Sequence, residues 1–192
     1  KSDPGVWPIP EDVVALIDNL KAQLVLYGQD KKPLWCTEGS WGDTSGNGFT
    51  DPDLHAAFLA RHYILENSEG VARYYWFAWD NGGDGLWDIV NDKITLAGTA
   101  YQQVENWLVG RTNNGQCKAN GTLWICNYTG SGGYQARIAW DTSQSCSKGS
   151  CTTKSVKAAT QFIHYKDLAG ITHTISNGTV PVGAKPIILE NK

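Results

Sequence analysis

Apolar side chains recur at helical spacing in three stretches of the first 110 residues, and two apolar, aromatic-rich runs lie between these stretches. Pro10 followed by two acids predicts a helix start, and the apolar periodicity continues until Gly28. A second helix is expected to begin at Asp51, because an aspartate cap precedes a proline there. The five elements are expected in the order helix 10–28, strand 34–38, helix 51–67, strand 71–80 and helix 99–109.

The pattern changes near Gly110, after which short strand-like runs are separated by Gly, Ser, Asn and Thr. The expected strands are 122–127, 134–140, 160–166, 172–176 and 187–189. We therefore expect an α/β region with a parallel sheet over residues 1–110 and an antiparallel β-sandwich over residues 111–192. Two parallel strands cannot close a core, so a further polypeptide segment or self-association is expected to cover the first region.

Charge and composition narrow the possible partners. The chain has 16 basic and 19 acidic residues without a block of either sign, which disfavours nucleic-acid and anionic-membrane partners. No apolar run reaches the roughly 20 residues of a membrane span. Nine tryptophans and eight tyrosines are many for 192 residues. Such rings stack on sugar faces, although any single one is more often a core residue.

Four of the five cysteines form close pairs, which are expected to be the disulfides Cys117–Cys126 and Cys146–Cys151. The alternative, a zinc site, is disfavoured because neither pair has the spacing of a zinc knuckle. The disulfides predict an oxidising, extracellular location. Cys36 is left over, and we interpret it as a small buried hydrophobe.

The four histidines do not converge in the sequence, so neither a metal site nor a cofactor is predicted. His55 and His62 lie seven residues apart on the second expected helix. We expect them to face solvent or a neighbouring helix.

Two segments carry a resemblance to a known group of enzymes. The run from Lys32 to Gly39 contains Pro-x-x-x-Thr-Glu-Gly, and Arg73–Asp80 reads Arg-Tyr-Tyr-Trp-Phe-Ala-Trp-Asp. Together they resemble the seventh and eighth strands of the clan A glycoside hydrolases, (β/α)8 barrels in which a glutamate ends strand seven and a tryptophan ends strand eight. The closing run Val180–Glu190 resembles the last strands of the β-sandwich that follows many of these barrels. The resemblance implies a partial barrel, units seven and eight, followed by a sandwich.

The resemblance also implies roles for individual residues. Glu38 would be the nucleophile of a retaining glycosidase, and Trp79 the platform for the sugar whose bond is cut. The clan's acid/base is a glutamate that follows an asparagine, and the sequence contains no Asn-Glu dipeptide. The chain alone is therefore expected to be inactive, with its acid/base in a missing N-terminal barrel segment. The alternative is that Glu38 is an ordinary loop carboxylate after a buried strand, without a catalytic role.

Neighbouring residues are weaker candidates for substrate binding. Trp41 and Trp87 are expected either to line outer sugar subsites or to lie in the core. Asp80 and Asp84 are expected to hold substrate hydroxyls or to make turns. Strict strand alternation would place Cys36 beneath Glu38 on one face, and Tyr75, Phe77 and Trp79 on one face of the later strand.

These observations lead to one main hypothesis and two alternatives. The main hypothesis is a secreted, retaining glycoside hydrolase of oligo- or polysaccharides, or its C-terminal fragment without the acid/base half. The first alternative is a noncatalytic carbohydrate-binding protein, and the second is a structural protein that assembles with another chain or with itself.

Overall fold

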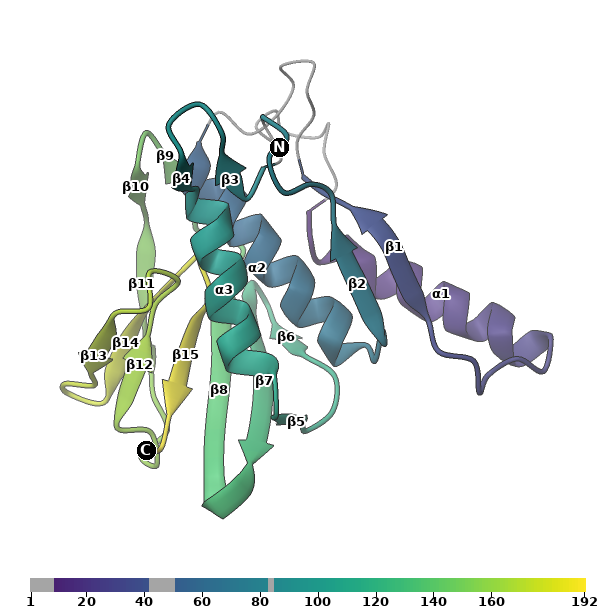
Figure 1. Ribbon diagram of the computed structural model, residues 1–192. Helices are drawn as coiled ribbons and strands as arrows, with labels where there is room; N and C mark the ends of the chain where they lie inside the picture. The colour runs from purple at the N-terminus through teal and green to yellow at the C-terminus, as the bar shows by residue number, and fades with distance from the viewer. Residues whose placement is uncertain (1–8, 42–50, 83–84) are drawn as a thin grey trace.

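The computed structural model describes residues 9–41, 51–82 and 85–192 (Figure 1). Three α-helices are present in this part of the chain: α1 (Asp12–Leu26), α2 (Pro52–Ser68) and α3 (Leu96–Leu108). The strands of the first 110 residues are β1 (Trp35–Gly39), β2 (Arg73–Trp76), β3 (Trp87–Asp88) and β4 (Lys93–Ile94). The later strands are β5 (Thr112–Asn113), β6 (Lys118–Asn120), β7 (Leu123–Gly130), β8 (Tyr134–Asp141), β9 (Cys146–Ser147), β10 (Ser150–Cys151), β11 (Thr153–Lys157), β12 (His164–Lys166), β13 (Thr172–Thr174), β14 (Thr179–Gly183) and β15 (Ile187–Glu190).

The helix starts follow from side-chain caps. Asp51 accepts hydrogen bonds from the backbone amides of Asp53 (2.9 Å) and Leu54 (3.1 Å), as its position before Pro52 predicts. Helix α3 starts at Leu96, three residues earlier than expected, because the Thr95 hydroxyl accepts from a backbone amide of the first turn, 3.0 Å away.

The larger sheet has the strand order β13-β12-β15-β8-β7-β5, with β6 also paired to β7. Its pairs are antiparallel, and the long hairpin β7–β8 pairs Leu123 with Asp141 at one end and Gly130 with Tyr134 at the other. Strands β11 and β14 form a separate antiparallel pair. The helix and strand order confirms a mixed fold of helices and sheets. The strands of the second region pair antiparallel, and their arrangement as a β-sandwich stays a prediction.

Different elements pack on the two faces of the larger sheet. On β8, Ile138 and Trp140 belong to a core cluster shared with residues of α2 and α3. Ala139 points the other way, into a cluster with Val180 and Val182 of β14. The main core thus joins residues from both sides of Gly110, and the boundary between regions 1–110 and 111–192 stays a prediction.

Helix α2 lies between the larger sheet and the small parallel sheet of β1 and β2 (Figure 1). Burial therefore extends around the whole helix rather than along one stripe. His55 is 7% exposed, and its ring lies 5.8 Å from that of Trp76. The His62 ring lies 4.8 Å from that of Tyr74. The expectation that these histidines face solvent or a neighbouring helix is wrong, because β2 covers them.

A buried carboxylate ties three distant segments together. Glu11, which precedes α1, accepts hydrogen bonds from Arg61 Nε of α2 at 2.7 Å and from Trp140 Nε1 of β8 at 2.6 Å. All three residues are at most 8% exposed. Because the charges are paired and hydrogen-bonded, burial of the ion pair is compatible with a stable fold.

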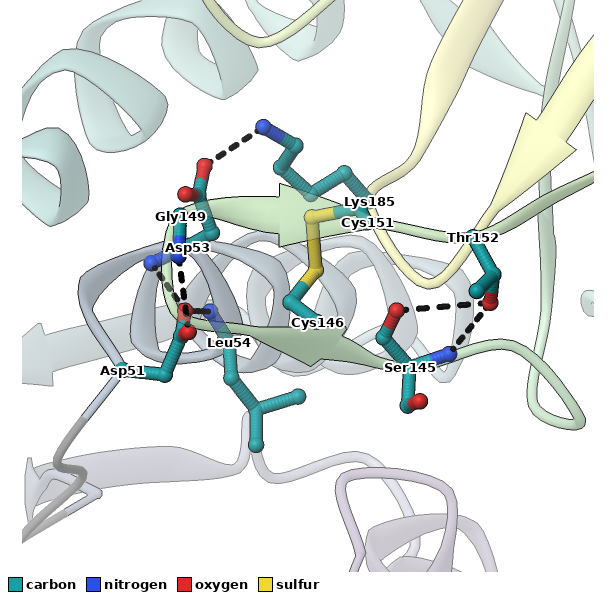
Figure 2. The surroundings of a disulfide bond; sticks show 9 residues. All are labelled: Asp51, Asp53, Leu54, Ser145, Cys146, Gly149, Cys151, Thr152 and Lys185. Atoms are coloured by element: carbon teal, nitrogen blue, oxygen red, sulfur yellow. Dashed lines mark hydrogen bonds and ion pairs between the residues drawn. A yellow bond between two sulfur atoms is a disulfide. The ribbon is translucent and has the colours of Figure 1, made fainter.

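Both expected disulfides are present, Cys117–Cys126 and Cys146–Cys151. The second closes the β9–β10 hairpin, which packs on the first turn of α2. Figure 2 shows the Gly149 amide of this hairpin donating to the Asp51 carboxylate, 3.3 Å away. Lys185 forms an ion pair with Asp53 at 2.6 Å in the same region. The disulfide hairpin therefore holds the start of α2, the helix that follows β1 in the chain, in place.

The strand boundaries differ from the sequence expectation, most of all in two runs that form much shorter strands than expected. The run Val71–Asp80 forms a strand only at 73–76, and the run 160–166 only at 164–166. Of the pair β11–β14, the sequence indicated only β14, which overlaps the closing run Val180–Glu190. In addition, the described helices include none long and apolar enough to cross a bilayer.

Candidate functional site: the open face of β1 and β2

Strands β1 and β2 run parallel and side by side, with Trp35 opposite Arg73 and Gly39 opposite Trp76. Parallel strands end at the same edge of a sheet, so the residues after both strands lie at one edge. The Phe77 amide donates to the Gly39 carbonyl at 2.9 Å, which continues the pairing past the end of β2. Glu38 and the Trp79–Asp80 segment therefore belong to the same carboxyl edge.

A shift in register changes the face on which Glu38 lies. Between Cys36 and Gly39, β1 has one residue more than the facing stretch of β2. Cys36 lies near Glu66 of α2, and Gly39 lies against the Tyr74 ring, so both face the helix side. Glu38 is exposed. The expectation that Cys36 lies beneath Glu38 on one face is wrong, because the extra residue breaks the alternation.

The alternation expected along the second strand is confirmed. Tyr75, Phe77 and Trp79 are 47%, 44% and 61% exposed, whereas the residues between them are half-buried. Tyr74 and Trp76 lie on the other face, against the aromatic rings of α2. The exposed rings form an apolar surface on the face opposite α2, which we call the open face.

Trp79 and Trp87 make a double platform. Their ring centroids are 5.9 Å apart and their planes are inclined by 9°. The Trp87 amide also donates to the Trp79 carbonyl at 2.7 Å, which brings β3 to the end of the second strand. Because Trp87 backs Trp79, the outer face of the Trp79 indole is held in place for stacking. Asp80 follows the platform and is exposed.

The other expected binding residues lie elsewhere. Trp41 is only 9% exposed, and its ring packs edge-on against Phe58 (5.3 Å) and His62 (5.8 Å). This position agrees with the core alternative rather than with a sugar subsite. Asp84 lies outside the described residues.

Beneath the open face lies a polar layer that the sequence did not single out as a unit. His62 Nε2 is 3.4 Å from Glu66 Oε1, one helical turn away. Burial lowers the pKa of His62, and of His55, to about 4 and raises the pKa of Glu66 to about 7. Burial, together with the nearby Glu66 carboxylate, also raises the pKa of the Cys36 thiol. The His-x-x-x-Glu spacing was visible in the sequence, but its burial depends on β1 and β2.

Within the described residues, this polar layer favours neither a metal site nor a reactive thiol. Among residues 9–41, 51–82 and 85–192, no three or more His, Cys, Asp or Glu side chains gather as a cation site. The Cys36 thiol is disfavoured as a nucleophile because its raised pKa keeps it protonated. The chemistry available at the open face is thus that of an exposed carboxylate, Glu38, beside aromatic rings.

No protein-family model and no curated protein matches the sequence, whereas solved structures do match. A family 39 glycoside hydrolase from Bacteroides cellulosilyticus WH2 matches with a TM-score of 0.63 at 21% identity, over 86% of this chain and 35% of that one. A glucosidase from Croceicoccus marinus matches with a TM-score of 0.58 at 15% identity, over 95% of this chain and 51% of that one. A family 30 subfamily 8 xylanase from Clostridium acetobutylicum matches with a TM-score of 0.57 at 13% identity, over 84% of this chain and 43% of that one.

At these identities the likeness concerns the fold alone. The chain spans between 35% and 51% of the length of these three enzymes. It therefore has a glycosidase-like fold, shared with part of solved glycoside hydrolases of families 30 and 39.

Proposed function

We propose that this chain supplies the nucleophile half of a retaining glycoside hydrolase, as the last two strands of a (β/α)8 barrel followed by a β-sandwich. The observation that carries the proposal is the carboxyl edge of β1 and β2. An exposed carboxylate, Glu38, ends one parallel strand, and an exposed indole, Trp79, follows the next. Active sites of (β/α)8 barrels lie at this edge.

The chemistry divides into two parts. In a retaining mechanism one carboxylate attacks the anomeric carbon, and a second carboxyl group, about 5 to 5.5 Å away, protonates the leaving oxygen and later activates water. Glu38 takes the first role. The second group comes from a segment outside this sequence, since the clan's Asn-Glu pair does not occur here.

The substrate class follows from the platform and from the structural neighbours. The stacked Trp79 and Trp87 present a flat apolar ring suited to the C–H face of a sugar. The neighbours include xylanases and a glucosidase, so xylose- or glucose-based oligo- and polysaccharides are the proposed ligands. The two disulfides favour an oxidising, extracellular setting.

The test uses substrates that need no acid. A 2,4-dinitrophenyl glycoside has a leaving group that departs without protonation, so a nucleophile alone can form the glycosyl-enzyme. We expect one equivalent of dinitrophenol per chain from a xyloside or glucoside, followed by very slow turnover because no base activates water. Glu38→Gln is expected to abolish this burst, and Glu105→Gln, the same change at an exposed position of α3, is expected to keep it. A burst of equal size in Glu38→Gln would overturn the proposed role.

The exposed Trp79 ring, stacked on half-buried Trp87, also favours a second function, noncatalytic glycan binding. This function predicts that xylo- or cello-oligosaccharides bind equally well to the wild type and to Glu38→Gln. It also predicts that Trp79→Ala loses binding. A dinitrophenol burst that depends on Glu38 would decide for the enzyme.

A further inference from the structure

A pocket lies in the second region of the chain, far in sequence from Glu38 and from the Trp79–Trp87 platform. It is lined by the β12–β13 hairpin, by residues of β14 and β15 and the turn between them, and by residues of β10 and β11. Its volume is about 240 Å³. Sites for small molecules begin at about 300 Å³, so this pocket suits a single small ring rather than a large ligand. We call it the hairpin pocket.

Two stacked rings contribute to the lining of the hairpin pocket. Tyr165 of β12 lies directly opposite His173 of β13 in the strand register. Their ring centroids are 4.7 Å apart, and their planes are inclined by 15°. Burial, together with the nearby Asp167 carboxylate, raises the pKa of Tyr165, so its hydroxyl stays protonated and can donate a hydrogen bond. The pair therefore combines flat apolar area with polar groups.

Asp167 holds the polar groups of the pocket in fixed positions. Its Oδ1 accepts hydrogen bonds from the backbone amides of Ala169 at 2.9 Å and Ile171 at 3.0 Å. His173 Nε2 donates to Asp167 Oδ2 at 2.9 Å, so Nδ1 of the same ring is left as an acceptor. The side chains of Asp167 and His173 are still 32% and 37% exposed. The two side chains thus form a preorganised and accessible polar pair.

Buried apolar side chains complete the lining. Leu168 and Ile187 are 5% and 6% exposed, and Pro186 is also buried. A concave, largely apolar surface with a few convergent polar groups is typical of a site for a small ligand. The hairpin pocket therefore offers apolar contacts beside the polar pair of Asp167 and His173.

The charges of the lining narrow the class of ligand. Asp167 disfavours an anion, and Lys185, the one lysine or arginine among the described lining residues, already pairs with Asp53 at 2.6 Å. No group of three or more His, Cys, Asp or Glu side chains in the described part of the chain could hold a metal ion. A wholly apolar ligand would cut off Asp167 and His173 from water without pairing them, which is costly. A neutral ligand with both hydroxyl groups and an apolar face fits best.

A sugar ring has both features. Its hydroxyls donate and accept hydrogen bonds, and its C–H face packs on flat apolar surfaces. We propose that the hairpin pocket binds one ring of a neutral sugar chain, with sugar hydroxyls on Asp167 and His173. This would be a second sugar site, on elements different from those of the Trp79–Trp87 platform. It does not depend on Glu38 being a nucleophile.

Small glycosides test the inference on the intact chain. The probes are methyl β-xyloside and methyl β-glucoside, and inorganic phosphate is the anionic comparison. Binding is followed by the amide chemical shifts of ¹⁵N-labelled protein. At least one glycoside is expected to shift the amides of Tyr165, Ala169 and His173, and phosphate is expected to leave them unchanged. The same shifts are expected in Trp79→Ala, which removes the platform but not the hairpin pocket.

Two variants and one control locate the effect. Asp167→Asn keeps the size of the side chain but removes its charge, and it is expected to weaken glycoside binding about tenfold. Asp18→Asn, the same change at an exposed position of α1, is expected to leave binding unchanged. Ala169→Arg adds a long side chain at an exposed position of the lining and is expected to weaken binding about tenfold. It remains informative if Asp167→Asn does not fold.

Several results would overturn the inference. They are unchanged Tyr165, Ala169 and His173 amides with both glycosides, shifts of these amides that disappear in Trp79→Ala, and equal binding by the wild type and Asp167→Asn. Shifts of the same amides by phosphate alone would assign the pocket to an anion instead. A failed dinitrophenol burst would leave the inference untouched, because binding in this pocket does not involve Glu38.

Discussion

The larger antiparallel sheet and the parallel pair β1–β2 use the same kinds of side chain in opposite surroundings. Trp140 of β8 is fully buried, stacks on Trp124 with centroids 5.8 Å apart, and donates a hydrogen bond to Glu11. Trp35 of β1 and Trp79 after β2 are 54% and 61% exposed. Helices cover one face of the larger sheet and β11–β14 the other, whereas α2 covers only one face of the parallel pair.

The difference separates the part of the chain that stabilises itself from the part that presents a surface. Apolar area removed from water stabilises a fold by about 25 cal/mol per Å². That gain is realised around Trp140 and is left unrealised on the open face. A ligand that covered the rings of the open face would realise it.

The largest expected effect comes from truncating equivalent rings in the two regions. Trp140→Ala is expected to lower the free energy of unfolding by about 3 to 5 kcal/mol, because it empties a packed site and removes one of the hydrogen bonds to buried Glu11. Trp35→Ala is expected to lower it by less than about 1 kcal/mol, since the ring is half-exposed. Urea unfolding measures both. Similar losses would break the distinction between the regions.

The disulfides provide a second, somewhat smaller contrast, because both lie outside the parallel pair. Replacing Cys117 and Cys126 with alanine is expected to cost about 2 to 3 kcal/mol, through the entropy of the unfolded chain. Replacing Cys146 and Cys151 is expected to cost slightly less, since the loop is shorter. Unchanged urea midpoints in both double variants would contradict this expectation.

The polar layer beneath β1 and β2 predicts a pH dependence with two opposing parts. His55 and His62 have pKa values lowered to about 4. Their contribution to the free energy of unfolding is therefore present above pH 6.5 and is lost as the pH falls toward 4. Glu66 has a pKa raised to about 7, so its contribution is present below pH 4.5 and is lost as the pH rises toward 7.

Single substitutions separate these two parts. As the pH rises from 5 to 7, Glu66→Gln is expected to become more stable relative to the wild type, because it has no carboxyl group to ionise. As the pH falls from 6.5 to 4, His62→Gln is expected to become more stable relative to the wild type, because it has no imidazole to protonate. Urea unfolding at successive pH values measures both trends. Parallel stability curves for the wild type and Glu66→Gln would show that this carboxyl group is not buried as described.

The smallest effect on stability is expected at the platform. Trp79→Ala is expected to cost less than about 1 kcal/mol, mainly through the lost stack on Trp87. The same variant is expected to lose oligosaccharide binding, followed by titration calorimetry. Trp124→Ala provides a matched loss of one ring from a stacked pair in the larger sheet. Equal loss of sugar binding in both variants would show that the effect is not local to the platform.

Local signals made much of this architecture predictable. The Asp51-Pro52 start of α2 and the cysteine spacings depend on residues close in sequence, and the structure agrees with both. The alternation of Tyr75, Phe77 and Trp79 was equally local. The nucleophile role of Glu38 came from resemblance and stays a prediction.

The rest depended on contacts between distant residues. No local signal marks Arg61 or Glu66 of α2 as buried, because Arg61 meets Glu11 from 50 positions away, and β1 and β2 bury Glu66. The extra residue between Cys36 and Gly39 is defined only by pairing with β2, so alternation along β1 alone placed Cys36 wrongly. Strand β11 was missed because its side chains are mostly exposed and polar.

The central claim is that Glu38 attacks the anomeric carbon of a sugar held at the open face, and covalent trapping tests it most directly. A 2-deoxy-2-fluoro xyloside or glucoside with a dinitrophenyl leaving group should add one glycosyl unit to the intact mass of the protein, and peptide mapping should place it on Glu38. Absence of any adduct, or an adduct on another carboxylate that persists in Glu38→Gln, would contradict the account.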